Sequence, residues 1–203
     1  MKNSTTRLKE APTMRSGLPL IILLIVLVIG LSACSIRNEE DVSDTQHRSF
    51  DSIVNAPFTS DRDKSDALLN EIVSCIEKQE EEALIDLFSP KQVSEQDMAQ
   101  QCTELFSFFS GNMVSYHWNG QEEDSSKHDG EYYKAITLSY DVFTNETQYW
   151  FAMKFCADDT KNEENIGIHS LYIVQLRDTD SEYSYWNDVN WTPGINVMTE
   201  PQA

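Results

Sequence analysis

The chain has 203 residues, and its 15 Lys and Arg residues against 34 Asp and Glu residues give a formal net charge of −19. Hydrophobic residues make up 40% of the chain and charged residues 24%, a globular composition with a strong acidic bias. This composition excludes collagen-like and extended low-complexity chains. It also excludes a multi-span membrane protein, because the one apolar run near bilayer length lies at the N-terminal end. We therefore expect a single folded domain and a targeting segment.

Residues 1–33 have the pattern of an export signal. Four basic residues and one acid precede the apolar stretch Leu18–Leu31, which is shorter than the roughly 20 apolar residues of a spanning helix. The stretch ends in Leu31-Ser32-Ala33-Cys34, which resembles a bacterial lipobox. That resemblance implies cleavage before Cys34 and a diacylglycerol on its sulfur. The alternative is an uncleaved N-terminal anchor with an incidental cysteine.

Either alternative places the rest of the chain outside the cytoplasm, because the basic residues precede the apolar run and acids follow it. Without residues 1–33 the formal charge becomes −22. Such a surface repels nucleic acid and anionic headgroups and favours cations or basic partners. We expect a membrane contact through the lipid on Cys34 and no nucleic-acid partner. The acidity is also explained if it simply keeps a tethered domain soluble.

Residues 34–62 are polar without a sustained period, which predicts a lipidated, flexible tether. The folded domain is expected over residues 63–198. A helical period first occurs in residues 64–79, with apolar side chains at three-to-four spacing: Leu68, Leu69, Ile72, Val73, Cys75 and Ile76. A shorter helix follows over 80–88 and ends at Ser89-Pro90.

A third helix is expected to begin at a capping-box variant, Ser94 with Asp97, and to end at Gly111. From Met113 the period changes to 2, which predicts strands. The candidate strands are 113–119, 131–144, 148–157, 166–177 and 183–189. A polar loop is expected over 120–130, a tight hairpin at 145–147 and a longer connection over 158–165.

This order predicts an α+β fold, with three N-terminal helices packed on a curved antiparallel sheet. The apolar residues at even-numbered positions of 132–142 are Ile136, Leu138, Tyr140 and Val142, and those at odd-numbered positions of 149–157 include Tyr149, Phe151, Met153 and Phe155. These two sets are predicted to face the helices.

Four segments carry a family resemblance: Phe106–Gly111, Ser115-Tyr116, Thr144–Tyr149 and Asn165–Leu171. They resemble a group of uncharacterised Gram-positive lipoproteins, the domain of unknown function 5104, over about residues 67–174. The resemblance implies the cone-shaped fold of nuclear transport factor 2 and ketosteroid isomerase, in which helices close over a bent sheet around a pocket. Enzymes of that fold carry an aspartate base in the cone, but no such motif transfers to this chain. Homodimers through the open sheet face are common in the fold, so a homodimer is an expectation by analogy.

Three side chains are candidates for acid–base chemistry. Asp141 and His117 share the polar parity of their strands and are expected to face water. His169 lies in a strand with apolar residues of both parities, so it is kept as a weak acid–base candidate. The alternative is a hydrogen-bonded structural histidine.

No metal site or cofactor is expected. The acidic segments 61–66 and 178–182 imitate the start of a calcium loop. Both lack the glycine at the sixth position and the glutamate at the twelfth. Beyond Cys34, three cysteines remain. Cys75 and Cys102 lie on apolar helical faces, so they form either a disulfide or two buried free thiols.

Six aromatic residues on inward parities are predicted to line a pocket, with core packing as the alternative. They are Phe106, Tyr116, Trp118, Tyr140, Phe151 and Tyr172. The leading functional hypothesis is a membrane-anchored, non-catalytic lipoprotein that binds a small ligand or an envelope partner. The alternatives are a pocket enzyme of the ketosteroid-isomerase type and an acidic accessory subunit of an envelope assembly.

Overall fold

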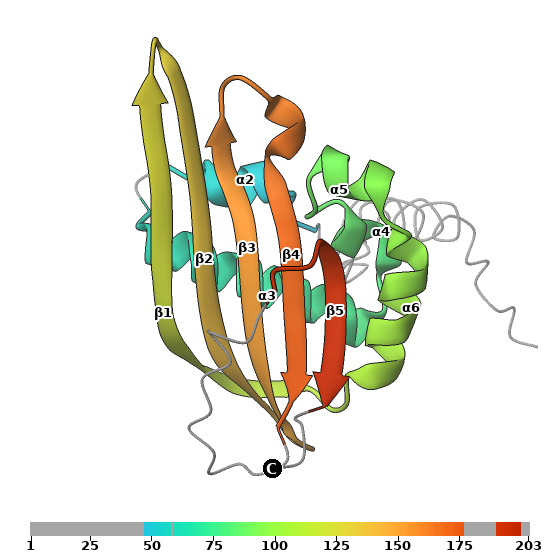
Figure 1. Ribbon diagram of the computed structural model, residues 1–203. Coiled ribbons are helices and arrows are strands. Elements are labelled where there is room, and N and C mark those ends of the chain that lie inside the picture. The colour runs from blue at the N-terminus through green and yellow to red at the C-terminus, as the bar shows by residue number, and fades with distance from the viewer. Residues whose placement is uncertain (1–46, 58, 177–189, 200–203) are drawn as a thin grey trace, which may run out of the picture. The chain divides into compact units, whose positions relative to one another are not determined.

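The computed structural model describes residues 47–57, 59–176 and 190–199. The expected signal peptide, Cys34 and the first part of the tether lie outside the described residues, as do the strand at 183–189 and the acidic segment 178–182. Within the described residues the chain has a mixed α+β fold around a five-stranded sheet (Figure 1).

Five α-helices precede the sheet in the described part of the chain. They are α2 (Phe50–Val54), α3 (Asp61–Lys78), α4 (Glu81–Ile85), α5 (Pro90–Glu95) and α6 (Met98–Phe108). The strands are β1 (Met113–His128), β2 (Glu131–Thr144), β3 (Gln148–Asp159), β4 (Gly167–Gln175) and β5 (Gly194–Thr199), with the 3₁₀ helix η1 (Glu163–Asn165) between β3 and β4. The sheet order is β1-β2-β3-β4-β5. Figure 1 shows α2 and α3 behind the sheet and α6 beside β5.

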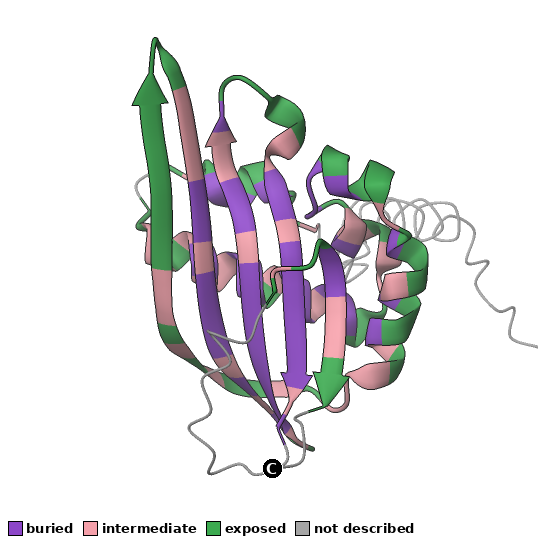
Figure 2. Ribbon diagram, viewed as in Figure 1, coloured by how far each residue is buried: buried purple, intermediate pink, exposed green. Residues whose placement is uncertain are grey.

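One hydrophobic core joins the helices to one face of the sheet. Leu69 and Ile72 of α3 belong to the same buried cluster as Leu138, Phe151 and Leu171 of the strands. The predicted inward parities are confirmed for eight residues that are buried in this cluster: Ile136, Leu138, Tyr140, Val142, Tyr149, Phe151, Met153 and Phe155. Figure 2 shows the burial concentrated in β2, β3 and β4. Each fully buried large apolar side chain contributes about 1.5–3 kcal/mol.

Helix α3 begins three residues before the predicted start because of a capping box. The Ser60 hydroxyl accepts a hydrogen bond from the Asp63 backbone N–H at 3.1 Å, and Asp63 Oδ2 accepts from the Ser60 backbone N–H at 3.1 Å. The helix ends at Gln79, which is left-handed with a φ of 56°. The six apolar residues predicted to form its inner face are all buried.

The C-terminal part of the predicted tether contains helix α2. Ser49 caps this helix, and its Phe50 and Ile53 side chains are buried in the core. The Phe50 ring contacts the Phe155 ring edge-on, with 5.7 Å between centroids. The compact unit therefore starts by His47 and not at residue 63. The physical reason is that three apolar side chains among the five residues of α2 are enough to pack this short helix against the core.

The third predicted helix is two helices. Ser89 caps α5, in which Pro90 occupies the first turn, where a missing N–H costs nothing. Ser94 lies inside α5, and Asp97 caps α6 by accepting from the Gln100 N–H at 3.2 Å. Gly111 lies three residues beyond the end of α6 and is not its cap.

Strand β1 is much longer than predicted. The segment expected as a polar loop, 120–130, continues β1 to His128 and turns at Asp129-Gly130, where both residues have positive φ. Bulges shift the register near residues 114 and 119, so Val114 is 66% exposed rather than inward. The last part of β1, residues 122–128, is exposed on both faces. It therefore lacks the alternation of apolar and polar residues that predicts a strand.

Strand β5 was not predicted, and it pairs parallel to β4. Gln101 of α6 holds it in place, because its Oε1 accepts from the Ile195 N–H at 2.8 Å. The expectation of a purely antiparallel sheet is therefore wrong. On the sheet face opposite the helices a second buried cluster lies on β3 and β4: Trp150, Ala152, Tyr172, Val174 and Leu176, with Trp191 packed against it.

Within the described residues, none of the helices combines the length and the apolar character needed to cross a membrane.

Candidate functional site

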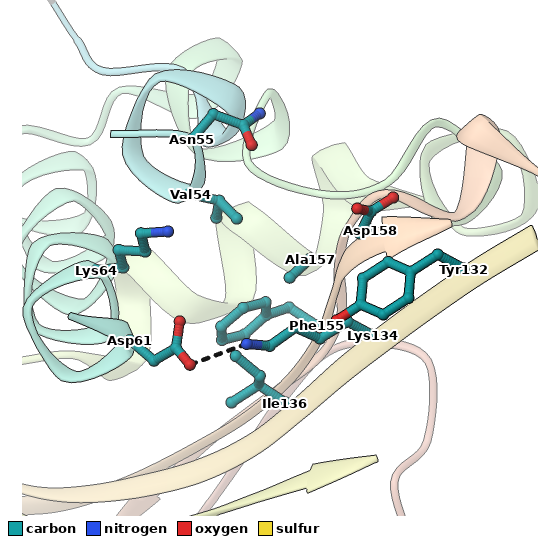
Figure 3. A pocket seen from close by; sticks show the side chains of 10 residues that line it. All are labelled: Val54, Asn55, Asp61, Lys64, Tyr132, Lys134, Ile136, Phe155, Ala157 and Asp158. Atoms are coloured by element: carbon teal, nitrogen blue, oxygen red, sulfur yellow. Dashed lines mark hydrogen bonds and ion pairs between the residues drawn. The ribbon is translucent and has the colours of Figure 1, made fainter. Parts of the chain in front are cut away.

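A cavity of about 130 Å³ lies where the N-terminal end of α3 faces β2 and β3 (Figure 3). Its apolar lining consists of Val54, Ile136, Phe155 and Ala157. Its polar lining consists of Asn55, Asp61, Lys64, Tyr132, Lys134 and Asp158. The cavity therefore combines an apolar floor with charged walls.

Local sequence explains how these side chains reach one place. The capping box at Ser60 starts α3 so that Asp61 and Lys64, three positions apart, lie on neighbouring turns of one face. In β2 the inward parity of the core continues past Ile136 to Lys134 and Tyr132. The inner row of that strand thus changes from apolar to polar where it leaves the core.

Lys134 is held between two acids. Its Nζ lies 2.9 Å from Asp61 Oδ2 and 3.2 Å from Glu123 Oε2, and its side chain is 18% exposed. Burial acts to lower the pKa of Lys134, but the hydrogen bonds and charges of Asp61 and Glu123 outweigh burial and raise that pKa. Lys134 therefore stays protonated and orders one wall of the cavity.

Lys64 and Asp158 have no ion pair with any other residue that the structure describes. Figure 3 shows them on opposite sides of the cavity, with Asn55 above and the Phe155 ring below. The cavity thus offers one ammonium and one carboxylate that are not already neutralised by a partner in the described chain.

None of the six aromatic residues predicted to line a pocket is among the ten that line this cavity. Phe151 and Tyr140 are fully buried in the core, and Phe106, Tyr116 and Trp118 pack against it. The prediction for Tyr172 is wrong, because Tyr172 lies on the opposite sheet face, where its hydroxyl accepts from the Thr192 N–H at 2.6 Å. Both faces of β4 are apolar, so parity could not choose between them.

Three of those aromatic residues gather around an ion pair of α3. Asp66 Oδ1 accepts hydrogen bonds from Tyr140 Oη at 2.8 Å and from Arg62 Nε at 2.7 Å. The Arg62 guanidinium lies 4.4 Å from the Trp118 ring centroid, and Tyr116 packs edge-on against Tyr140. Burial, followed by the hydrogen bond to Asp66, raises the pKa of Tyr140. The cluster joins α3 to β1 and β2.

The three acid–base candidates lie apart from the cavity. His169 Nε2 lies 2.6 Å from the carbonyl oxygen of Asn165, and burial lowers the pKa of its ring. His117 is exposed, and Asp141 accepts from Asn119 Nδ2 at 3.1 Å on the outer side of β1 and β2. This geometry fits the hydrogen-bonded alternative for His169.

Cys75, Cys102 and Cys156 are free and buried in the structure, so the disulfide between Cys75 and Cys102 is not formed there. Burial raises the pKa of Cys75 and of Cys102 to about 12, and the charges of Glu71 and Glu80 add to the effect at Cys75. Burial raises the pKa of Cys156 to about 11. All three thiols are therefore protonated near neutral pH.

One cluster of side chains that could hold a metal ion was not predicted from the sequence. His47, Glu71 and Cys75 each offer one ligand atom, and these atoms lie within 4.8 Å of one another. The local signal was the i, i+4 spacing of Glu71 and Cys75 on one helix face. His47 could not be assigned to them because it precedes Glu71 by 24 residues.

The acidic segment 61–66 stabilises the start of α3 through the capping box and the ion pair of Arg62 with Asp66. It also forms part of the cavity wall through the ion pair of Asp61 with Lys134. The segment forms the N-terminal end of α3.

Comparison with known proteins places this domain in a family. No curated protein matches the chain. The model of one family, described as a domain of unknown function (DUF5104), matches residues 71–176, from the middle of α3 to just past the end of β4. Because this match covers more than half of the 203 residues, the chain belongs to the DUF5104 family.

Proposed function

We propose that this protein is a membrane-anchored, non-catalytic binding module whose cavity between α3 and β2–β3 holds a small zwitterion of amino-acid size. The observation that carries the proposal is the pair of Lys64 and Asp158. These opposite charges face each other across an apolar floor, and neither has an ion-pair partner in the described chain.

A zwitterion matches the cavity in charge and in size. Its carboxylate binds the Lys64 ammonium, its ammonium binds the Asp158 carboxylate, and its carbon atoms contact Phe155 and Ile136. Charge-assisted hydrogen bonds of this kind contribute about 1.5–3 kcal/mol each. A cavity of about 130 Å³ is close to the size, about 150 Å³, of an engineered cavity that holds benzene.

The state of Lys134 favours binding over catalysis. A lysine acts as a base or a nucleophile when its pKa is lowered toward neutrality. The two acids beside Lys134 raise its pKa instead. Its role in the proposal is to keep Asp61 in place.

The anchor and the cone-like fold are part of the same proposal. The leader that ends at Leu31-Ser32-Ala33-Cys34 supports a lipid on Cys34 and a domain held outside the cytoplasm. The cone of nuclear transport factor 2 is supported by helices α2 and α3 sharing one core with the inner face of the sheet. The cavity then lies at one end of the layer between helices and sheet.

Calorimetry on the full-length protein in mild detergent tests the function. We expect small amino acids to bind, and to bind more tightly than carboxylates without an amine or amines without a carboxylate. Lys64→Gln and Asp158→Asn each remove one charge-assisted bond, so each should weaken binding roughly 10- to 150-fold.

The matched control is Lys78→Gln, which removes an exposed ammonium in the last turn of α3, at the opposite end of that helix from Lys64. It should leave the affinity unchanged. If the zwitterions bind no better than the matched carboxylates, or if Lys64→Gln behaves like Lys78→Gln, the proposed function is wrong.

A further inference from the structure

A second group of side chains outside the cavity has the composition of a metal site. His47 precedes α2, and Glu71 and Cys75 lie one turn apart on α3. His47 Nδ1 lies 2.8 Å from Glu71 Oε1 and 3.6 Å from Cys75 Sγ. Cys75 is fully buried, whereas the His47 side chain is 26% exposed. An ion could therefore enter on the His47 side and reach a sulfur ligand inside.

The spacing of nitrogen and sulfur fits tetrahedral zinc. Zinc bonds of about 2.3 Å to sulfur and about 2.0 Å to nitrogen at a tetrahedral angle place the two ligand atoms about 3.5 Å apart. His47 Nδ1 and Cys75 Sγ are 3.6 Å apart. Two tetrahedral zinc ligands, one nitrogen and one oxygen, lie about 3.4 Å apart. Glu71 Oε1 and His47 Nδ1 are only 2.8 Å apart. A small outward rotation of Glu71 would admit the ion.

The other ring nitrogen is oriented as in many zinc sites. His47 Nε2 lies 2.6 Å from Glu80 Oε2, just beyond the end of α3. When Nδ1 of a histidine binds zinc, its Nε2 carries the proton and usually donates it to a carboxylate, which fixes the ring. The backbone N–H of Arg48 donates to Glu71 Oε1 at 3.1 Å and holds the second ligand. Two of the three ligands, His47 and Glu71, are thus supported by neighbours that orient them.

We propose that His47, Glu71 and Cys75 bind a zinc ion, with Glu80 as a positioning residue behind His47. A thiolate, an imidazole and a carboxylate together suit zinc better than calcium or magnesium, which prefer oxygen ligands. Water fills the fourth position. Zinc takes the place of the thiol proton of Cys75, which leaves to solvent, so affinity falls as pH falls.

Cobalt substitution tests the ligand set directly. The full-length protein, reduced and freed of metal in mild detergent, is titrated with Co²⁺ and then with Zn²⁺. We expect one Co²⁺ per chain, with the sulfur-to-cobalt absorption and the intense visible bands of a tetrahedral site, both abolished by one equivalent of Zn²⁺. Co²⁺ that binds without the sulfur band would be held by surface acids and would overturn the proposal.

Matched variants separate this site from general loss of folding. Cys75→Ser should abolish the sulfur band, whereas Cys102→Ser, which removes an equally buried thiol on α6, should keep it. Glu80→Gln should weaken Zn²⁺ binding by roughly 10- to 100-fold, and Glu82→Gln, an exposed acid on α4, should not.

If circular dichroism shows that Cys75→Ser does not fold, His47→Gln decides the question. His47 lies at the edge of the compact unit and is partly exposed, so its replacement should leave the fold intact and lower Zn²⁺ affinity. Unchanged affinity in folded His47→Gln, or a sulfur band in Cys75→Ser, overturns the proposal.

Discussion

Replacement of Gly167 by alanine should destabilise the fold more than the same replacement at a glycine with no neighbouring atoms where a Cβ would lie. Gly167 begins β4 with a φ of 130°, and a Cβ there would lie 2.5 Å from the Ser89 backbone N and 2.7 Å from Ser89 Cα. Those atoms are fixed, because the Ser89 N–H donates to the Ile168 carbonyl at 3.1 Å and the Ile168 N–H to the Leu87 carbonyl at 3.0 Å. No side-chain rotation can relieve the contact.

Two costs add in Gly167→Ala. A non-glycine residue in this backbone region costs about 1–3 kcal/mol, and overpacking against fixed atoms costs about 1–3 kcal/mol more. The sum, about 2–6 kcal/mol, is a large part of the 5–15 kcal/mol that typically stabilises a domain. Gly130 has a φ of 88° with nothing within 4 Å of a Cβ, so Gly130→Ala should suffer only the first cost.

Urea denaturation followed by tryptophan fluorescence measures both free energies of unfolding in the full-length protein. We expect Gly167→Ala to be less stable than Gly130→Ala by about 1–3 kcal/mol. A difference within about 0.5 kcal/mol, the usual effect of a neutral surface change, would refute the close approach of β4 to the α4–α5 connection.

Three further substitutions test other parts of the structure by the same denaturation assay. Phe50→Ala should lower the free energy of unfolding by about 3 kcal/mol or more, because Phe50 is 5% exposed and packs on Phe155. An unchanged free energy of unfolding would show that α2 is not part of the folded core. Tyr140→Phe keeps the ring and removes one hydrogen bond to the Asp66 carboxylate, so about 1.5–3 kcal/mol should be lost, and a loss of zero would contradict that bond. The Asn165 side-chain hydrogen bond, with backbone donors, lowers the pKa of Asp159, so its stabilising effect is present above the unfolded value of about 3.9. It is lost as pH falls through the folded pKa, and the stability difference between wild type and Asp159→Asn should shrink below about pH 4; a difference as large at pH 2 as at pH 7 would contradict the assignment.

The parts of the fold that could be predicted are those with one apolar face. The inner face of α3 and the inward positions of β2 and β3 follow from side-chain period, which is a local property of the chain. The length of β1 could not be predicted, because its distal half lies in water on both sides and has no apolar alternation. Capping was predicted at Ser94 but occurs at Asp97, since both residues offer a cap within a few positions.

The candidate sites were the least accessible to prediction. Lys64 and Lys134 are ordinary charged residues in the sequence, and only the pairing of α3 with β2 places them in one cavity. His47 and Glu71 meet across 24 residues of chain, for which no local period exists. Tyr172 was assigned to the wrong face because both sides of β4 are covered.

The sequence by itself determined the acidic character, the α+β order and the inner faces of the amphipathic elements, and it predicts an export leader with a lipobox pattern. All of these depend on residue type and on spacing within one segment. The tertiary structure alone decided the parallel addition of β5, the cavity in which Lys64 and Asp158 have no ion-pair partner among the described residues, and the cluster of His47, Glu71 and Cys75. These depend on which segments pack together, because long-range contacts follow from burial of the whole core and not from any local pattern.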